Sequence, residues 1–436
     1  MNFENAWEYM LNLSKRGIHP GLDGVKLLCA SLGNPETDLR FIHVVGTNGK
    51  GSTSLFISEM LRAAKYKVGV FSSPSVFEDL EIIKVNGRNI SHADYARLVE
   101  LISSKNTFGC TRFEVETAMA FLYFKEKKCD FVVLEAGMGG LLDATNVIET
   151  AEASVFTSIG MDHVDYLGDT IEKITENKAG VIKSNSLVIS TFSGENVLNI
   201  IKERADRLNS DFIISDYRNA EKVSYKSQYT TFTYRGMKDL KLNLLGTYQL
   251  QNAALAIDTV LSLKNISVSE GAIRKGLEAA KEGGRFEKIL DKPVFILDGA
   301  HNEPASLALR DTLETYFTKK RFIYIMGMLK DKDVETVVKN TVDLASCVFT
   351  VPTSNKVRTM SSFELAKVVK AYNPMVSSLD SADEAVEMAL MMANADAKKD
   401  IVIVAFGSLS HLNDIKKAVS KRKSFKKDTH GVDYGR

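Results

Sequence analysis

One segment constrains the fold of this chain more than any other: residues 41–61, which read FIHVVGTNGKGSTSLFISEML. Its first five residues are mostly apolar or β-branched and predict a buried strand, and a helical pattern begins as soon as the glycine-rich stretch ends. Glycines let the backbone between them wrap with its N–H groups pointing inward, at the amino end of the helix, where anions are favoured. The segment therefore predicts a phosphate-binding loop between a strand and a helix.

The side chains of this loop have separable roles. Lys50 can reach the outer phosphates of a nucleotide, and Ser52 supplies a hydroxyl group at the start of the helix. The spacing is that of a variant P-loop, because Gly51 stands between the lysine and the hydroxyl residue. A glycine-rich turn beside a surface lysine is the alternative, and the strand, loop and helix context disfavours it. The candidate nucleotide-binding residues are Asn48, Gly49, Lys50, Gly51 and Ser52.

The following residues repeat this alternation of short strands and longer helices. Such a pattern is typical of a parallel sheet that is covered by helices on both faces. We therefore predict an α/β fold whose amino-terminal domain is doubly wound and contains the P-loop. The candidate strands of its sheet are residues 41–45, 67–71, 130–135, 153–158 and 187–190.

A change of pattern divides the rest of the chain. Residues 228–245 alternate like antiparallel strands around a turn with glycine, which predicts a small β appendage. Helical patterns at 249–263 and 269–281 follow, and two glycines interrupt them just before Arg285. Four buried-strand patterns come after this break and predict a smaller, Rossmann-like α/β domain. We place the two domains at residues 1–287 and 288–436.

Composition excludes several classes of protein. The 436 residues, 44% of them hydrophobic, can bury two large cores. Lys and Arg number 56 against 55 Asp and Glu, so bulk charge favours neither a nucleic acid nor a membrane as partner. No apolar run approaches the roughly 20 residues that span a bilayer, and the amino terminus lacks a secretory pattern. The four cysteines are scattered, as in reduced thiols. We expect a cytoplasmic monomer.

Polar side chains at three other strand ends point to the same edge of the sheet. Glu135 ends a buried strand beside the phosphate loop, which is the usual place for a carboxylate that holds Mg2+. Ser73 follows another strand, but an ordinary serine-capped turn explains it better. His163 follows a third strand, and both a structural role and a ligand role stay open for it. Lys178 lies on a helical pattern whose polar residues predict a solvated face.

Taken together, these segments resemble folylpolyglutamate synthase and the bifunctional dihydrofolate synthase, members of the Mur ligase superfamily. The resemblance spans nearly the whole chain, and its motifs occur in the family's order: GTNGKGST, SSP, EAGMGGLLDATN, MDH, LGDT, NKAG, QLQNAA, GGRFE, LDGAHN, MLKDKD and FGS. It implies an ATP-dependent enzyme that joins L-glutamate to the carboxylate of dihydropteroate, of tetrahydrofolate or of both.

The resemblance also implies roles for single residues. Mg2+, expected as two ions, would be bound by Ser73, Glu135 and His163, and Lys178 would be carbamylated near the second ion. ATP would further contact Asn252, Arg285 and Asp298. The pterin-bearing substrate would bind at Thr111, Arg112, Phe113, Glu114, Leu142, Asp143 and Ala144, and the incoming glutamate would face His301 and Ser408. The residues implied in catalysis are Lys50, His163, Lys178 and His301.

Amide formation from a carboxylate requires a leaving group, which phosphorylation by ATP provides. An acyl phosphate is therefore the expected intermediate, with Lys50, the loop amides and Mg2+ neutralising the transferring phosphoryl group. Two other functions stay open: a Mur-superfamily ligase acting on a peptidoglycan precursor or another acceptor, and a regulatory P-loop ATPase. A dinucleotide-binding protein is disfavoured, because Lys50 occupies a loop where the pyrophosphate needs close backbone approach.

Overall fold

The chain divides into two compact units in this computed structural model, which describes residues 1–428 except 18, 397 and 399. One unit comprises Met1–Ser224, Thr230–Asn243 and Tyr248–Lys281. The other comprises Tyr225–Tyr229, Leu244–Thr247 and the described part of Glu282–Arg436. The units are thus interleaved along the chain, and the placement of functional domains at 1–287 and 288–436 stays a prediction.

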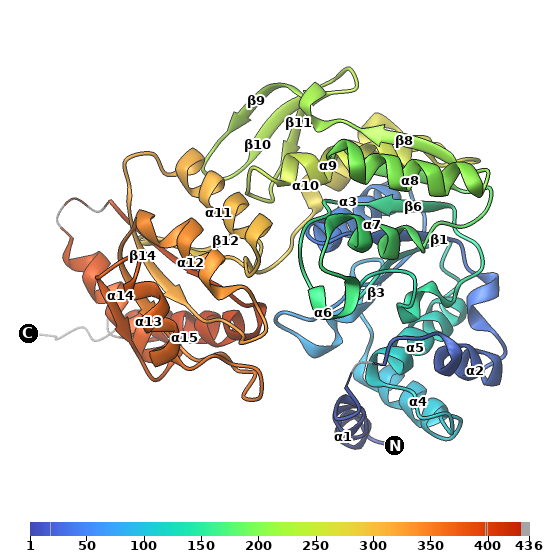
Figure 1. Ribbon diagram of the computed structural model, residues 1–436, viewed down its shortest axis with the longest axis horizontal. Helices are drawn as coiled ribbons and strands as arrows, with labels where there is room; N and C mark the ends of the chain where they lie inside the picture. Colours follow the sequence, from blue (N-terminus) through green and yellow to red (C-terminus); the bar gives the residue numbers. More distant parts are fainter. Residues whose placement is uncertain (18, 397, 399, 429–436) are drawn as a thin grey trace, which may run out of the picture. The chain divides into compact units, whose positions relative to one another are not determined.

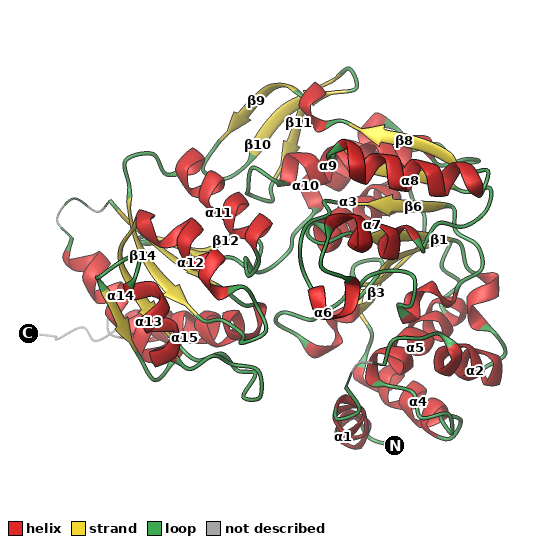
Figure 2. Ribbon diagram, in the orientation of Figure 1, coloured by secondary structure: helices red, strands yellow, loops and turns green. Residues whose placement is uncertain are grey.

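An eight-stranded sheet forms the centre of the first unit, in the order β4-β3-β2-β5-β1-β6-β7-β8 (Figures 1 and 2). The strands from β2 to β8 in this order are parallel, and all five predicted strands are among them. The bounds are β1 (Phe41–Val45), β2 (Val68–Phe71), β3 (Ile83–Val85), β4 (Arg88–Asn89), β5 (Phe131–Glu135), β6 (Ala153–Phe156), β7 (Leu187–Thr191) and β8 (Asp211–Ser215).

The sheet departs from parallel pairing at one edge. β3 pairs antiparallel with β2, and β4 pairs antiparallel with β3. The turn between β3 and β4 consists of Asn86 and Gly87, whose φ angles of 50° and 75° are those of a tight hairpin turn. The α/β fold itself is confirmed, and the sheet is mixed.

Helices cover both faces of this sheet. Phe41 belongs to the core that includes α5, and Val45 belongs to the core that includes α7 and α8. Alternate residues of a strand point to one face, so these helices share a face of the sheet. Ile42 and Val44 are equally buried, and α3 and α9 contact the sheet as well. The helices of this unit are α1 (Phe3–Ser14), α2 (Asp23–Ser31), α3 (Lys50–Ala63), α4 (His92–Ser103), α5 (Arg112–Glu126), α6 (Val164–Leu167), α7 (Ile171–Ala179), α8 (Glu195–Arg207), α9 (Gln249–Ser262) and α10 (Glu270–Ala279), with short 3-10 turns between.

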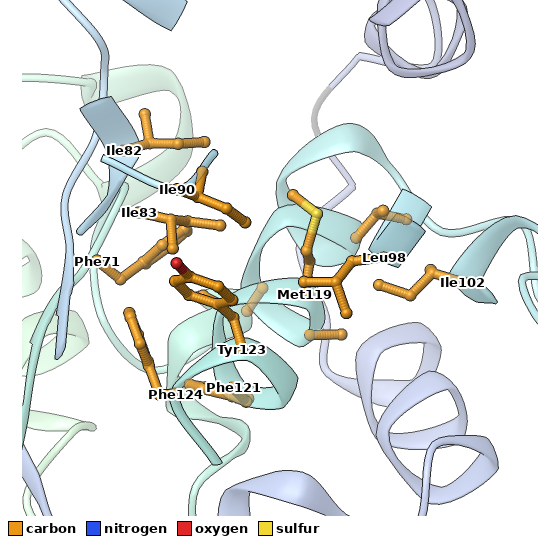
Figure 3. Close-up of a cluster of buried hydrophobic side chains, with 14 of the residues drawn as sticks. Phe71, Ile82, Ile83, Ile90, Leu98, Ile102, Met119, Phe121, Tyr123 and Phe124 are labelled. Carbon is orange, nitrogen blue, oxygen red and sulfur yellow. The ribbon is translucent and has the colours of Figure 1, made fainter. Parts of the chain in front are cut away.

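A large apolar core lies between α4, α5 and strands β2 and β3 (Figure 3). Phe71 of β2, Ile83 of β3 and Phe124 of α5 converge there, and each is fully buried. Leu98 and Met119 extend the same cluster toward α4. Burial of such side chains supplies the main driving force for docking these helices on the sheet.

The predicted β appendage is confirmed as a three-stranded sheet, in the order β11-β10-β9. β10 (Thr230–Tyr234) and β11 (Met237–Leu242) are antiparallel and turn at Arg235 and Gly236, whereas β9 (Glu221–Tyr225) was not predicted. Its residues alternate less clearly between buried and exposed.

The second unit contains a six-stranded sheet in the order β12-β13-β17-β14-β15-β16. β12 pairs antiparallel with β13, and the other strands are parallel, as the predicted Rossmann-like domain requires. The elements are β12 (Glu287–Asp291), β13 (Val294–Leu297), α11 (Glu303–Tyr316), β14 (Arg321–Met326), α12 (Val334–Thr341), β15 (Ala345–Thr350), α13 (Ser362–Lys370), β16 (Val376–Ser378), α14 (Ala382–Ala395), β17 (Ile401–Phe406) and α15 (Leu409–Asp428). In the described part of the chain, no helix has the length and apolar character to cross a bilayer.

Helix α10 lies unusually close to α3. A Cβ atom at Gly276 would lie 2.5 Å from the backbone nitrogen of Met60, so the two backbones touch where a side chain would otherwise separate them. Gly271 lies on the same helix, but the nearest atom to its Cβ position is 3.9 Å away.

We expect Gly276→Ala to lower the free energy of unfolding by about 1–3 kcal/mol, because the added methyl group must push two helices apart. Gly271→Ala should be neutral or stabilising by up to about 1 kcal/mol, since alanine favours a helix over glycine. Urea denaturation of both variants checks this pair. Equal effects of the two substitutions would contradict the close helix contact.

Candidate active site

The loop after β1 is anchored to the loop after β6. The N–H of Thr47 donates to the carbonyl oxygen of Ser158 at 2.8 Å, and its hydroxyl group exchanges hydrogen bonds with Gly160 at 2.9 and 3.0 Å. Gly49, the N-cap of α3, has a φ of 86°, a left-handed conformation that glycine adopts without strain. The first N–H groups of α3 lack intrahelical partners and can bind an anion.

Two lysines point at the same carbonyl oxygen in this loop. The Nζ atom of Lys50 lies 3.1 Å from the carbonyl oxygen of Gly46, and that of Lys178 lies 2.9 Å from it. Lys178 comes from α7 and is 3% exposed, so the predicted solvated face is wrong at this position. Burial and the nearby charge of Lys50 lower the pKa of Lys178 to about 7.

Both lysines line a pocket in the first unit. Its walls are Gly46, Thr47, Lys50, Gly137, Met138, Gly139, Asp162, His163, Leu167 and Lys178. His163 adopts a φ of 52°, and its N–H donates to the Oδ1 atom of Asp162 at 2.9 Å. Left-handed conformations of residues other than glycine cluster at functional sites. The pocket thus combines two cationic side chains, one carboxylate and one imidazole.

Glu135 and Ser73 lie at the same edge of the sheet. Glu135 is the last residue of β5 and 5% exposed, which excludes a surface carboxylate. Phe71, which ends β2, is paired with Leu134, so Ser73 emerges from the adjacent strand. Neither residue lines the pocket, although the chain leads from Glu135 directly to Gly137. No group of three or more His, Cys, Asp or Glu residues with metal-binding geometry occurs within residues 1–428 as described.

Asn252 reaches the phosphate loop through a glutamine that the sequence did not single out. The Nδ2 atom of Asn252 donates to Oε1 of Gln249 at 3.0 Å, and Nε2 of Gln249 donates to the hydroxyl oxygen of Ser52 at 3.2 Å. Gln249 is fully buried. The Oδ1 atom of Asn252 lies 2.4 Å from the position of a Cβ atom at Gly49. The amino end of α9 therefore fixes the start of α3.

The structure gives most of the stretch from Thr111 to Glu114 a local role. Thr111 and Glu114 form a capping box at the start of α5, in which Oε2 of Glu114 accepts the N–H of Thr111 at 2.7 Å. The guanidinium group of Arg112 pairs with Glu116 and lies 4.9 Å from the ring centre of Trp7. Phe113 is the member nearest the pocket, since its Cζ atom lies 2.6 Å from the Cβ position of Gly137.

The second predicted substrate segment is also largely buried. Asp143 and Ala144 are 7% and 5% exposed, and the carboxylate of Asp143 accepts hydrogen bonds from Thr145 and Met138. Leu142, in contrast, is 46% exposed. Phe113 and Leu142 are therefore the members of the two segments with apolar surface to offer a ligand.

In the second unit, four predicted residues gather at the carboxyl end of its sheet. Asp298 follows β13 and accepts the N–H groups of Ala300 and Phe286 at 2.8 and 2.9 Å. Arg285 and Leu409, which follows Ser408, both lie beside Gly299. His301 shares the loop, and its Nδ1 atom lies 2.7 Å from the carbonyl oxygen of Gly299. Ligands of open α/β sheets bind at this end of the strands.

Comparison with known proteins decides the family. Residues 44–260 match the Mur ligase middle domain, and residues 284–409 match the Mur ligase glutamate ligase domain. The chain is 34% identical to the dihydrofolate synthase/folylpolyglutamate synthase of Bacillus subtilis, over 95% of this chain and 98% of that protein. It belongs to the dihydrofolate synthase/folylpolyglutamate synthase family.

Other members of the family agree with this assignment. The Escherichia coli dihydrofolate synthase/folylpolyglutamate synthase is 33% identical over 76% of this chain and 77% of its own length. The structure of E. coli FolC in complex with DHPP and ADP has a TM-score of 0.85 at 29% identity, covering 97% of this chain and 99% of that one. Mycobacterium tuberculosis folylpolyglutamate synthase, complexed with ADP and AMPPCP, gives 0.86 at 26% identity, covering 99% and 100%. The resemblance seen in the sequence motifs is thus confirmed.

The low pKa of Lys178 predicts a specific dependence of stability on pH. Between about pH 7 and pH 10 the unfolded chain binds the Lys178 proton more readily than the folded chain, so stability rises with pH in this window. Lys178→Met should remove that rise and stabilise the ligand-free protein at pH 7.

Thermal unfolding at several pH values measures the effect. Lys173→Met is the matched control, because Lys173 lies on the same helix with its side chain 60% exposed, and its effect should stay within about 0.5 kcal/mol. A Lys178→Met variant with the pH dependence of the parent would show that the buried amine keeps an ordinary pKa.

Proposed function

We propose that this chain joins L-glutamate to the carboxylate of a folate-type substrate, coupled to conversion of ATP to ADP and phosphate. This ATP-dependent ligation is the activity of the family to which the chain belongs. The observation that carries the proposal is the pair of lysines, Lys50 and Lys178, beside a phosphate loop in one pocket. Such a pair suits a reaction in which a phosphoryl group moves and its charge must be stabilised.

ATP would bind with its phosphates on the loop between β1 and α3. Lys50 would leave the carbonyl groups of Gly46 and Thr47 and turn to the phosphates, which are stronger acceptors. The N–H groups of Gly51 and Ser52 would hold the phosphate oxygens at the helix amino end. Asn252 would contact the nucleotide from α9, held in place by Gln249. The related structures from M. tuberculosis and E. coli are complexes with ADP, which supports an adenine nucleotide as the ligand.

The residues proposed for Mg2+ offer suitable donors. Ser73, Glu135 and His163 would supply a hydroxyl oxygen, a carboxylate and an imidazole, and Mg2+ prefers oxygen ligands and keeps several waters. The buried carboxylate of Glu135 fits a cation rather than solvent. Asp162, beside His163 in the pocket wall, is a further carboxylate at this edge. Bound there, Mg2+ would supply positive charge against the phosphate oxygens of ATP.

Lys178 is proposed to be carbamylated. Its neutral amine would attack carbon dioxide, form an N–C bond and release one proton, leaving an anionic carbamate. A pKa of about 7 provides the neutral amine at physiological pH, and 3% exposure protects the product. The change would also replace one of two adjacent cations by an anion beside Lys50, and it would supply an oxygen ligand for a second Mg2+.

The ligation itself needs no enzyme nucleophile. A carboxylate oxygen of the folate substrate would attack the terminal phosphorus of ATP and release ADP, giving an acyl phosphate. The neutral amine of glutamate would then attack the acyl carbon and expel phosphate, with proximity lowering the barrier. We propose that His301 and Ser408 hold the glutamate, and that Arg285 and Asp298 contact ATP.

The folate-type substrate would use the apolar surface of Phe113 and Leu142. Phe113 packs beside Gly137 in the pocket wall, and the adjacent capping box holds it in place. We propose that both dihydropteroate and reduced folates are accepted. The double activity in the names of the relatives from B. subtilis and E. coli supports this reading.

The test is phosphate release by the purified protein with Mg-ATP and L-glutamate, with products identified by mass. Dihydropteroate, tetrahydrofolate, a peptidoglycan precursor and no acceptor are compared. We expect each pterin to gain one glutamate, and Lys50→Met to reduce kcat at least about 100-fold through lost charge stabilisation. Phosphate release without acceptor and without a ligated product would show that the protein is an ATPase and not a ligase. Ligation to the peptidoglycan precursor alone would show that the folate-type substrate is wrong.

The carbamate has its own signature. With 13C-labelled bicarbonate, the wild-type protein should show a carbamate carbon resonance that grows as pH rises through about 7, because the neutral amine reacts. Lys178→Arg should lack the resonance, since a guanidinium group stays protonated. A resonance that persists in Lys178→Arg would place the modification on another lysine.

A further inference from the structure

A buried chain of hydrogen bonds connects the central strand with the pocket wall. Nε2 of His43, in the middle of β1, lies 2.9 Å from Oγ1 of Thr145. The hydroxyl group and the N–H of Thr145 both donate to Oδ1 of Asp143, and Oδ2 of Asp143 accepts the N–H of Met138 at 2.8 Å. His43 and Thr145 are fully buried, whereas Met138 lines the pocket.

The donor and the acceptor in each of these hydrogen bonds can be assigned, because the Thr145 hydroxyl group has only one hydrogen to donate. The single hydroxyl hydrogen of Thr145 is directed at the Asp143 carboxylate, so its oxygen accepts the proton of His43 Nε2. His43 is therefore the neutral tautomer with hydrogen on Nε2, and its Nδ1 finds no partner within the described residues. Burial, with the nearby charge of Lys183, lowers the pKa of His43 to about 3 and keeps this state at neutral pH.

The loop from Gly137 to Asn146 has a second anchor. Nδ2 of Asn146 donates to the carbonyl oxygens of Leu141 and Gly180 at 3.0 and 3.2 Å, which ties the end of the loop to the turn after α7. That anchor leaves the carboxylate of Asp143 untouched. Thr145 contacts the carboxylate of Asp143, and His43 in β1 contacts Thr145 in turn.

We propose that His43 is a positioning residue for the folate-type substrate: through Thr145 it orients the Asp143 carboxylate and thereby holds Met138 and Leu142 in the shape that the substrate meets. Being fully buried, His43 acts without touching the substrate. The inference rests on the proposed function. It gives a core histidine a share in selectivity for the pterin-bearing substrate, whereas Thr47 and Gln249 hold the phosphate loop through other hydrogen bonds.

Two matched pairs of variants test this role. Thr145→Val removes the hydroxyl group at constant shape, and Thr145→Ser retains it. His43→Leu removes the N–H donor, and His43→Gln replaces it. We expect Thr145→Val and His43→Leu to raise the KM for the pterin substrate about tenfold, with the KM for ATP within about twofold of wild type. Thr145→Ser and His43→Gln should recover most of the loss.

The double variant His43→Leu/Thr145→Val should raise the pterin KM no further than the more damaging of the two single variants does. The reason is that residues of one hydrogen-bond chain act as a unit. A pterin KM equal to that of wild type, or parallel increases in the KM for pterin and ATP, would overturn the positioning role. If His43→Leu fails to fold, as judged by circular dichroism, the Thr145 pair alone decides.

The protonation state of the His43 imidazole tests this inference independently of the proposed ligase activity. Two-bond proton–nitrogen NMR spectra of the ligand-free protein should show His43 as the Nε2–H tautomer, without titration from pH 5 to 8. A titrating or Nδ1–H imidazole would overturn the hydrogen-bond chain even where the wild-type enzyme is active. Wild-type protein that ligates glutamate to no pterin would instead overturn the proposed function, and the positioning role with it.

Discussion

The carbonyl oxygen of Gly46 accepts hydrogen bonds from the amines of two lysines, and this contact joins two helices of the first unit to the phosphate loop. Lys50 arrives from α3 and Lys178 from α7, so the helices on both faces of the sheet must be in place to form it. Burial, and then the nearby charge of Lys50, lower the pKa of Lys178, because both disfavour its protonated form. The ligand-free pocket is therefore poised to gain negative charge, which a phosphate or a carbamate can bring.

Much of the fold could be predicted because its central strands are buried on both faces. β1 and β5 show uninterrupted burial, and such strands appear in the sequence as continuous runs of mostly apolar residues. The missed strands are short or lie at edges. β4 contains only Arg88 and Asn89, and the apolar run of β8 is only three residues long, from Phe212 to Ile214, which is too short to indicate a strand by itself. The turn at Asn86 and Gly87 was the available signal for the hairpin at one edge.

Site residues could be predicted where a reactive side chain stands at or just after the end of a strand. They could not be predicted where contacts between distant parts of the chain determine their position. Glu135 ends β5 and Lys50 begins the helix after β1, so their location at one edge of the sheet could be derived from the order of elements. Lys178 lies on an amphipathic helix, and only the folded structure shows that its amine points inward. The hydrogen bond from Gln249 to Ser52 joins residues far apart in the sequence, so it could not be predicted from the spacing of motifs. The same holds for the contact of His43 with Thr145.

The contact between Gly276 and Met60 has a mechanical consequence. Packed interiors resist compression, and two backbones that touch have no side chain between them to absorb a displacement. The carboxyl-terminal part of α3 is thus fixed against α10. A shift of α3, and of the phosphate loop at its amino end, therefore requires α10 to shift with it. Because α10 is the last helix before the chain leaves the first unit at Lys281, the same contact connects the helix of the phosphate loop with the point where the chain leaves this unit.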